Sequence, residues 1–374
     1  MTRITVICGI AGNPRISKRI ETLVSSENEV SVIYWNRTHG FGMRLPRQQG
    51  ARYFEIGGTN VRNPIKRFFE TRRLNAETFE KLEKIQPDIV YVMHLECMFS
   101  ARKYCRKNKS LFVFEISDLP GAWYLKNLGF LRGPLSGILD RIVSSADAFV
   151  MTSPFFFTNY YRDRTRIPEE RVFVFENVPR RCVFEKIRKE PSKKLRVGFV
   201  GGVRYFRSLQ TLVEAAKGLD DVEVIIAGAG PQIDAVEEIS RGSANITLLG
   251  GYDYEKDIAR IYSGLDIVYS VYDPEMLNVK LALPNKLYEA IVCEIPIIVA
   301  SGTCLEEYVK ELGVGFSVTH GDVGSLRDLL VTLSLDRESL NKISQHESRI
   351  KERFFYENIE KNFLEWLEGL KRSR

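Results

Sequence analysis

The residues best suited to chemistry in this 374-residue chain surround Pro284, Asn285 and Lys286, with Glu289 three positions further on. Proline is pre-organised for helix entry, so the sequence predicts a helix that starts at Pro284 or Asn285 with unpaired amides at its end. Such an end suits a phosphate, and Lys286 adds a positive charge. Glu289 lies about one turn further along, where a carboxylate can accept two hydrogen bonds from a ribose diol. The alternative is a plain ion pair between Lys286 and Glu289.

A glycine turn is the second candidate for anion binding. Gly201 and Gly202 follow the predicted strand 195–200 and precede a helix predicted to begin near Phe206. Glycines there let backbone amides approach an anion at a helix N-terminus. The spacing is not G-x-G-x-x-G, and the next strand ends in Gly-Ala-Gly-Pro from Gly228 instead of an acidic residue, which argues against a dinucleotide dehydrogenase. A tight turn without a ligand is the alternative.

The elements that must position these residues are strands alternating with helices. Short β-branched and aromatic runs alternate with helical patterns from end to end, which is typical of parallel sheets with crossover helices. The predicted strands span 4–10, 29–35, 52–56, 88–94, 111–117, 148–152 and 171–176, then 195–200, 222–227, 246–249, 266–272, 295–300 and 315–318. His94 ends one of them, at the edge where open α/β sheets bind ligands. A purely structural histidine is the alternative.

The alternating pattern breaks once, between Asn177 and Lys194, where a charged stretch predicts a linker. The chain length suits two domains of about 150 residues each. The predicted N-terminal domain spans 1–180 and the C-terminal domain 195–350. Past Asp336 the pattern is purely helical and needs a surface to pack on. The apolar residues at helical spacing there are Phe354, Phe355, Ile359, Phe363, Trp366 and Leu367.

Composition narrows the class of protein. The chain is 44% apolar and 27% charged, which is ordinary for a folded protein. The six cysteines include no C-x-x-C pair, so neither a disulfide framework nor a structural metal is expected. We find no signal-peptide pattern and no apolar run of about 18 residues. These features predict a cytoplasmic protein.

The net charge of +6 is partly concentrated between Arg102 and Lys109, a stretch with no acidic residue. It suits an anionic partner, but it has little aromatic interleaving and no recognition motif, so nucleic acid is not expected. We predict shallow docking on anionic lipid, helped by apolar residues of a predicted loop. Those residues are Trp123, Tyr124, Leu125, Leu128, Phe130 and Leu131. A solvated helix face and a buried loop are the alternatives.

Four segments resemble family-four glycosyltransferases of the GT-B type. They are Asn13-Pro14-Arg15-Ile16 (D-P-R-V in the family), Pro87-Asp88-Ile89-Val90-Tyr91 (P-D-V-V-H), Gly228-Ala229-Gly230-Pro231 (G-x-G-P) and residues 283–290 (P-N-K-L-x-E-A). The similarity covers most of the chain and is strongest over 196–318. It implies two Rossmann-like domains whose parallel sheets face a central cleft, with the acceptor site in the first domain and the donor site in the second. A C-terminal helix, at about 355–374, would cross back to complete the first domain.

The resemblance also implies roles for single residues. Glu289 would bind the donor ribose, and Arg207 takes the place of a phosphate-binding lysine. Gly202 stands where many members have an arginine, and Arg204 would reach the same phosphates instead. Leu281 stands where many members have the first glutamate of a Glu, seven residues, Glu pattern. The implied donor-binding residues are Gly201, Gly202, Arg204, Arg207, Gly228, Pro284, Asn285, Lys286, Leu287 and Glu289.

The catalytic candidates lie in the first half of the chain. Residues 114–119 resemble the family segment Y-D-x-H-D-L, with Ser117 where histidine is frequent. In that alignment Asp118 faces the cleft, and we group it with His94 as a catalytic candidate.

The predicted function is transfer of a sugar from a nucleoside-diphosphate sugar to a glycan or lipid-linked acceptor. The resemblance implies retention at the anomeric carbon, no cofactor and no obligatory metal. The basic stretch and the apolar loop predict that the enzyme lies on the cytoplasmic face of a membrane. One alternative is a nucleotide-sugar 2-epimerase, which would change the donor without any acceptor. Another is a non-catalytic nucleotide-sugar-binding subunit, which Leu281 and Ser117 make credible.

Overall fold

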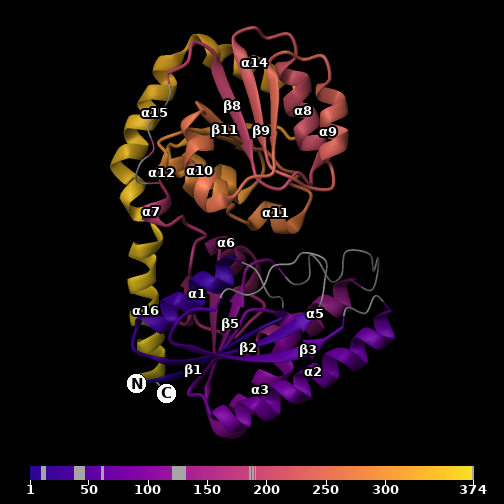
Figure 1. Cartoon of the computed structure of the whole chain (residues 1–374), viewed down its shortest axis with the longest axis vertical. Helices are drawn as coiled ribbons and strands as arrows, with labels where there is room; N and C mark the ends of the chain where they lie inside the picture. The colour runs from indigo at the N-terminus through magenta and orange to yellow at the C-terminus, as the bar shows by residue number, and fades with distance from the viewer. Residues whose placement is uncertain are drawn as a thin grey trace. The chain divides into compact units, whose positions relative to one another are not determined.

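The computed structural model describes residues 1–9, 14–37, 47–59, 63–119, 132–184, 187, 189 and 191–372. The chain forms two compact units, Met1–Glu176 with Glu360–Arg374, and Asn177–Ile359. Each unit is built on its own parallel sheet flanked by helices (Figure 1). Residues 120–131, which include the apolar loop predicted to touch lipid, and Asn13 lie outside the described residues.

The sheet of the first unit is parallel throughout. Its strands are β1 (Arg3–Cys8), β2 (Glu29–Arg37), β3 (Ala51–Gly58), β4 (Ile89–Val92), β5 (Leu111–Ile116), β6 (Ala148–Met151) and β7 (Val172–Val174), in the order β3-β2-β1-β4-β5-β6-β7. The order runs outward in both directions from the neighbours β1 and β4. β4, β5 and β6 are buried along their whole length, which explains their nearly continuous apolar sequences.

The sheet of the second unit repeats this topology. Its strands are β8 (Leu195–Val200), β9 (Val222–Ala227), β10 (Ile246–Gly250), β11 (Ile267–Ser270), β12 (Ile297–Ala300) and β13 (Gly315–Val318), in the order β10-β9-β8-β11-β12-β13. Here the order runs outward from β8 and β11. All thirteen predicted strands overlap strands of the structure, so the predicted α/β class is confirmed.

Helices connect the strands as crossovers. In the first unit they are α1 (Pro14–Ser25), α2 (Pro64–Ile85), α3 (Met98–Asn108), α5 (Arg132–Val143) and α6 (Pro154–Phe156), with short turns η1 (Leu95–Cys97), η3 (Phe157–Tyr161) and η4 (Glu169–Arg171). In the second they are α7 (Arg181–Phe184), α8 (Phe206–Ala216), α9 (Ile233–Ser240), α10 (Tyr254–Ser263), α11 (Leu277–Leu281), α12 (Asn285–Val292), α13 (Cys304–Leu312), α14 (Val323–Leu335), α15 (Arg337–Ile350) and η5 (Lys351–Phe354). Within the described parts of the chain, we find no helix with the length and apolar character to cross a bilayer.

The last helix, α16 (Tyr356–Arg372), ends in the first unit, which confirms that the C-terminal helix returns to it. Phe363 is fully buried, with its ring 5.2 Å from that of Phe175. Trp366 Nε1 donates to the backbone oxygen of Glu170 at 3.1 Å. Lys371 Nζ donates to Thr2 Oγ1 at 3.0 Å, so both ends of the chain meet (Figure 1).

A buried ion pair lies beneath this helix. Arg19 Nε donates to Glu115 Oε2 at 3.0 Å, and both side chains are almost fully buried. The Arg19 guanidinium carbon lies 3.3 Å from the centre of the Phe175 ring and 5.0 Å from that of Phe363. Burial raises the pKa of the Glu115 carboxyl, but the charges of Arg19 and Arg15 lower it by more, so the pKa lies below its usual value.

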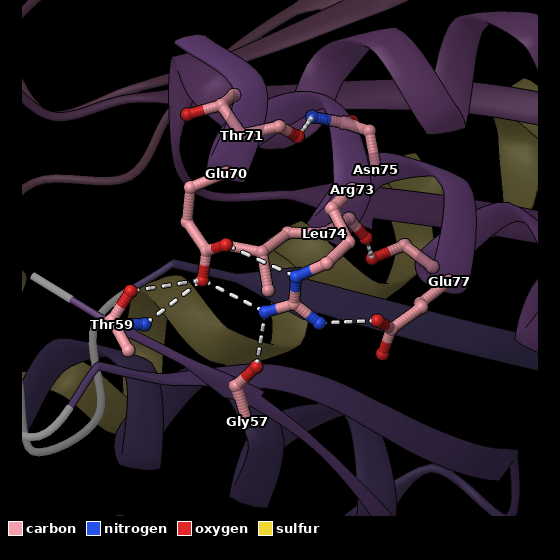
Figure 2. Close-up of polar contacts among 9 residues, drawn as sticks. Gly57, Thr59, Glu70, Thr71, Arg73, Leu74, Asn75 and Glu77 are labelled. Atoms are coloured by element: carbon pink, nitrogen blue, oxygen red, sulfur yellow. Dashed lines mark hydrogen bonds and ion pairs between the residues drawn. The ribbon is translucent and has the colours of Figure 1, made fainter. Parts of the chain in front are cut away.

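A polar network fixes the start of α2 against the end of β3. Arg73 donates to Gly57 O at 2.7 Å and to Glu70 at 2.8 and 3.0 Å, and it also pairs with Glu77 (Figure 2). The same Glu70 accepts from the Thr59 amide at 2.9 Å. The hydrogen bond from Arg73 lowers the pKa of Glu70 to about 2, against a smaller opposing effect of burial. One face of α2 is therefore held to the sheet by polar contacts.

Candidate functional site

The candidate donor site lies at the carboxyl edge of the second sheet, where the strand order reverses. Gly201 follows β8, and Tyr272 follows the neighbouring β11. Open α/β sheets bind ligands at this kind of switch point, because the loops after the two strands diverge there. The structure thus brings the loops predicted from separate motifs to one edge of one sheet.

Two glycine loops cross in direct contact at this edge. The Gly201 amide donates to Ala227 O at 2.8 Å, and the Val203 amide to Ala229 O at 3.1 Å. A Cβ atom on Gly228, whose φ is +148°, would lie 1.8 Å from Gly201 O. Only glycine allows this approach, so the Gly-x-Gly-Pro loop is required for the shape of the turn.

Lys286 joins the helix start to this turn. A Cβ atom on Gly201 would lie only 3.1 Å from Lys286 Nζ, so the ammonium group sits against the turn. It donates to Tyr272 Oη and lies 4.6 Å from the centre of the Phe199 ring. The predicted helix is α12, with Pro284 as its N-cap residue. A positive charge, a helix N-terminus and a glycine turn therefore converge, as an anion site requires.

The other residues at the start of α12 differ in exposure. Asn285 is exposed and Pro284 is partly buried. Leu287 is fully buried, and its amide donates to Pro284 O at 3.1 Å. Its side chain supports the helix start from inside the domain, and the donor-binding role of Leu287 stays a prediction.

The two arginines near the glycine turn are exposed. A Cβ atom on Gly202 would lie 3.2 Å from Arg204 Nε, so Arg204 folds back over the turn. Arg207, in the first turn of α8, lies over Gly321 in the loop after β13, with Nη2 3.0 Å from a Cβ atom placed there. Lys286 and Arg204 therefore place positive charge at the Gly201–Gly202 turn, and Arg207 places positive charge at the loop after β13.

His320 stands next to Arg207, and the sequence analysis missed it. Its Nε2 lies 3.4 Å from Ser208 Oγ. Burial lowers the pKa of His320, the charge of Asp273 opposes this, and the charge of Arg207 adds to it. The available signal was its position two residues after the predicted strand 315–318.

Glu289 carries the clearest electrostatic feature of the second unit. Its side chain is 4% exposed, and its two oxygens accept from Tyr254 Oη at 2.8 Å and Tyr262 Oη at 2.7 Å. Lys286 bonds to Tyr272 instead, so the predicted alternative of a Lys286–Glu289 ion pair is not found in the described contacts of these two side chains. Each carboxylate oxygen has a second lone pair, which leaves capacity for a ligand hydroxyl.

Tyrosine side chains contact both Glu289 and Lys286, and sequence reasoning did not identify them. Burial and the charge of Glu289 raise the pKa of Tyr254. Burial, with the charges of Glu289 and Tyr272, raises the pKa of Tyr252 to about 12. These hydroxyls therefore stay protonated at neutral pH, and that of Tyr254 donates to Glu289.

The candidate site in the first unit lies at the corresponding switch point. The Gly9 amide, after β1, donates to Nδ1 of His94, after β4, at 3.0 Å. Because Nδ1 accepts this bond, the proton of the neutral ring lies on Nε2. Asp118 follows β5, and its side chain is exposed. Across the described ranges, no cluster of three or more histidine, cysteine or acidic residues is placed to hold a metal ion.

Leu281, where the family resemblance leads one to expect a glutamate, ends the short helix α11 and is 4% exposed. Its side chain supplies no carboxylate to the donor site. The position at which this sequence has Leu281 instead of the family's glutamate is therefore buried in the structure.

Comparisons with known proteins agree with this geometry. Residues 194–336 match the family "Glycosyl transferases group 1". Sucrose-phosphate synthase from Thermosynechococcus elongatus has a similar structure, with a TM-score of 0.78, 14% identity and 100% of each chain covered. HepE of Anabaena in complex with UDP-glucose has a TM-score of 0.69 and 15% sequence identity, and the match covers 99% of this chain and 100% of HepE. The lipopolysaccharide outer core galactosyltransferase WaaB has a TM-score of 0.69 and 15% sequence identity, and the match covers 98% of this chain and 99% of WaaB. No curated protein matches the sequence significantly.

Proposed function

We propose that this chain, which has the GT-B fold and whose residues 194–336 match the group 1 family, is a glycosyltransferase that moves a sugar from a nucleoside-diphosphate sugar to a glycan or lipid-linked acceptor. The family match favours transfer over the epimerase and the non-catalytic alternatives. The observation that carries the proposal is on α12: Lys286 lies against the Gly201 turn while Glu289, one turn later, presents a buried carboxylate.

The donor is bound through its two chemically different parts. The diphosphate lies against the Gly201 turn, where Lys286, Arg204 and Arg207 supply positive charge. The Glu289 carboxylate accepts from the ribose hydroxyls, and Tyr254 and Tyr262 hold it in place. HepE has been crystallised with UDP and with UDP-glucose, which makes UDP the first nucleotide to test.

The residues of the donor domain act mainly by electrostatics. Negative charge develops on the leaving diphosphate as the glycosidic bond breaks, and oriented positive groups that meet this charge lower the barrier. Three cations at the site supply that charge, so we propose a reaction that needs no obligatory metal or cofactor. Retention at the anomeric carbon is proposed from the family resemblance alone. His94 and Asp118 serve the acceptor side. We place the enzyme in the cytoplasm, at the membrane face, in the synthesis of a lipid-linked glycan intermediate or polysaccharide precursor.

A screen of nucleoside diphosphates tests the proposal directly. Thermal unfolding of the whole chain is measured with UDP, ADP, GDP, CDP and dTDP. We expect one of them, at about 100 times its dissociation constant, to stabilise the protein by about 2.7 kcal/mol. If all five leave the unfolding temperature unchanged at millimolar concentration, the donor site does not exist as proposed.

Replacing Arg207 with alanine separates the phosphate site from the nucleoside site. We expect the affinity for the nucleoside diphosphate identified by the screen to fall about tenfold, because a charged hydrogen bond to the diphosphate is lost. The affinity for the bare nucleoside should stay within twofold. Calorimetry measures both, and Arg241→Ala, an exposed arginine of the same unit, is the matched control. Equal losses for nucleoside and diphosphate would contradict the role of Arg207.

A further inference from the structure

Four large apolar side chains are exposed at the start of α2 and on α3. Ile65 is 69% exposed, Phe68 63%, Phe69 62% and Phe99 50%. The rings of Phe68 and Phe69 lie edge to face, 5.7 Å apart. We call these four residues the α2 patch. Single exposed apolar residues are ordinary on protein surfaces, but a group of large ones marks an interaction site.

The fold of α2 explains why these side chains point outward. At 3.6 residues per turn, Leu74, Thr78 and Leu82 share one face of the helix, and this face is fully buried. A second face carries the bonds from Arg73 and Glu70 to the end of β3 (Figure 2). The first two faces of α2 are thus in contact with the rest of the unit, and the remaining face, which points to solvent, carries the α2 patch. The first turn is also capped, because Asn63 Oδ1 accepts from the amides of residues 65 and 66 at 3.0 and 3.1 Å.

Contacts between α2 and the start of α3 bring Phe99 to the same region. Glu96 pairs with Arg67, one residue before Phe68. Asn75 donates to Glu96 O at 2.9 Å and accepts from the Ser100 amide at 3.0 Å. Phe99 lies between these two anchored positions, and the two helices pack against each other. The patch is therefore held on two ordered helices.

The charges around the patch are predominantly positive. Residues 64–73 contain four basic residues and one acidic residue, and residues 98–109 contain five basic residues and none acidic. Glu70 is already bonded to Arg73 and Thr59, and the neighbouring Glu96 and Glu83 pair with Arg67 and Lys107, so these carboxylates are neutralised. Lys66 and Arg72 flank the aromatic residues and are exposed. Apolar side chains within a positive surface complement an anionic bilayer, where the rings enter the headgroup boundary and the charges meet the lipid phosphates.

We propose that the α2 patch is the surface by which this chain docks on an anionic lipid bilayer. It includes the basic stretch of α3 that the sequence analysis singled out, whereas the apolar loop named with that stretch lies outside the described residues. The inference rests on the proposed membrane-linked acceptor, but it involves no residue of the donor site. Lipid binding can therefore be measured without any nucleotide.

Sedimentation of the whole chain with vesicles tests the proposal. Vesicles of phosphatidylcholine alone are compared with vesicles that also contain phosphatidylglycerol. We expect the protein to bind the anionic vesicles, with an affinity that falls as salt is raised. The double variant Phe68→Ser/Phe69→Ser should bind at least about tenfold more weakly, because two aromatic side chains no longer enter the boundary. Lys66→Glu/Arg72→Glu should bind more than about tenfold more weakly at low salt.

Leu335→Ser is the matched control, because Leu335 is 78% exposed on the second unit and should not contact lipid. All variants should keep the unfolding temperature of the wild type. Binding that is equal on neutral and anionic vesicles, absent from both, or unchanged in Phe68→Ser/Phe69→Ser overturns the proposal. A wild-type dimer that this double variant dissociates in sedimentation velocity also overturns it, because the patch would then join two copies. Lipid binding without any nucleotide binding would instead contradict only the proposed function.

Discussion

Replacing Glu289 with glutamine is expected to lower the affinity for the donor nucleotide by about tenfold to hundredfold while the protein stays folded. The carboxylate accepts charged hydrogen bonds from the ribose hydroxyls in the proposed complex, and such bonds contribute about 1.5–3 kcal/mol. Glutamine keeps the shape of the side chain but removes the charge. One oxygen remains to accept from Tyr254 or Tyr262, so we expect a smaller cost to stability than to binding.

Two tyrosine variants show whether the orientation of the carboxylate matters in addition to its charge. Tyr254→Phe and Tyr262→Phe each remove one hydroxyl donor and leave Glu289 charged. If the tyrosines position the carboxylate, each should weaken nucleotide binding by about threefold to tenfold, which is less than the full value of a hydrogen bond to a charged group.

Calorimetry with the nucleotide, together with circular dichroism as a check of folding, measures the effects of all three variants. Glu311→Gln, an exposed carboxylate on α13, is the control and should bind like the wild type. A folded Glu289→Gln protein with unchanged nucleotide affinity would remove the donor-site assignment and the strongest residue-level argument for it.

Replacing Arg19 with methionine is expected to destabilise the first unit by about 3–5 kcal/mol, the largest stability effect that we predict. Methionine leaves the buried Glu115 carboxylate without its 3.0 Å hydrogen bond, and it removes the guanidinium that lies over the Phe175 ring. Arg15, 3.4 Å from the other oxygen of Glu115, remains as the only arginine that pairs with it among the described ion pairs.

Calorimetric unfolding of the whole chain measures this change. Arg52→Met is the matched control, because Arg52 and Glu29 form an exposed ion pair, which is worth less than about 1 kcal/mol. Adding Glu115→Gln to Arg19→Met should recover part of the loss, since it removes the buried carboxylate charge that only Arg15 then compensates among the described ion pairs. A loss in Arg19→Met no larger than that in Arg52→Met would show that the buried pair does not hold this unit together.

The same pair determines an acid sensitivity with a definite sign. The pKa of Glu115 is lowered in the folded protein, because the charges of the two arginines outweigh the effect of burial. A lowered carboxyl pKa contributes stability that is present above the unfolded value of about 4.3 and is lost as the pH falls through the folded value. The difference in stability between wild type and Arg19→Met should therefore be greatest near neutral pH and shrink in acid.

The strands of this protein were predictable because strand formation depends on local preferences. Leu195–Val200, Val222–Ala227 and Gly315–Val318 are observed with the predicted ends. Their β-branched and apolar residues suit a sheet covered on both faces, whichever neighbours they acquire. The start of α12 at Asn285 was predictable for a similar reason, since proline restricts the backbone at its own position.

The amino-acid sequence by itself thus determined the α/β class, an apolar C-terminal helix that needs a surface to pack on, and the presence of a glycine turn and a basic helix start. Only the tertiary structure decided which groups meet. Tyr262 and Tyr254 reach Glu289 across 27 and 35 residues, Arg19 reaches Glu115 across 96, and Ser208 reaches His320 across 112. Backbone preferences act over a few residues, whereas these contacts depend on the order of strands in the sheet. That order follows from packing the whole chain, which no local spacing specifies.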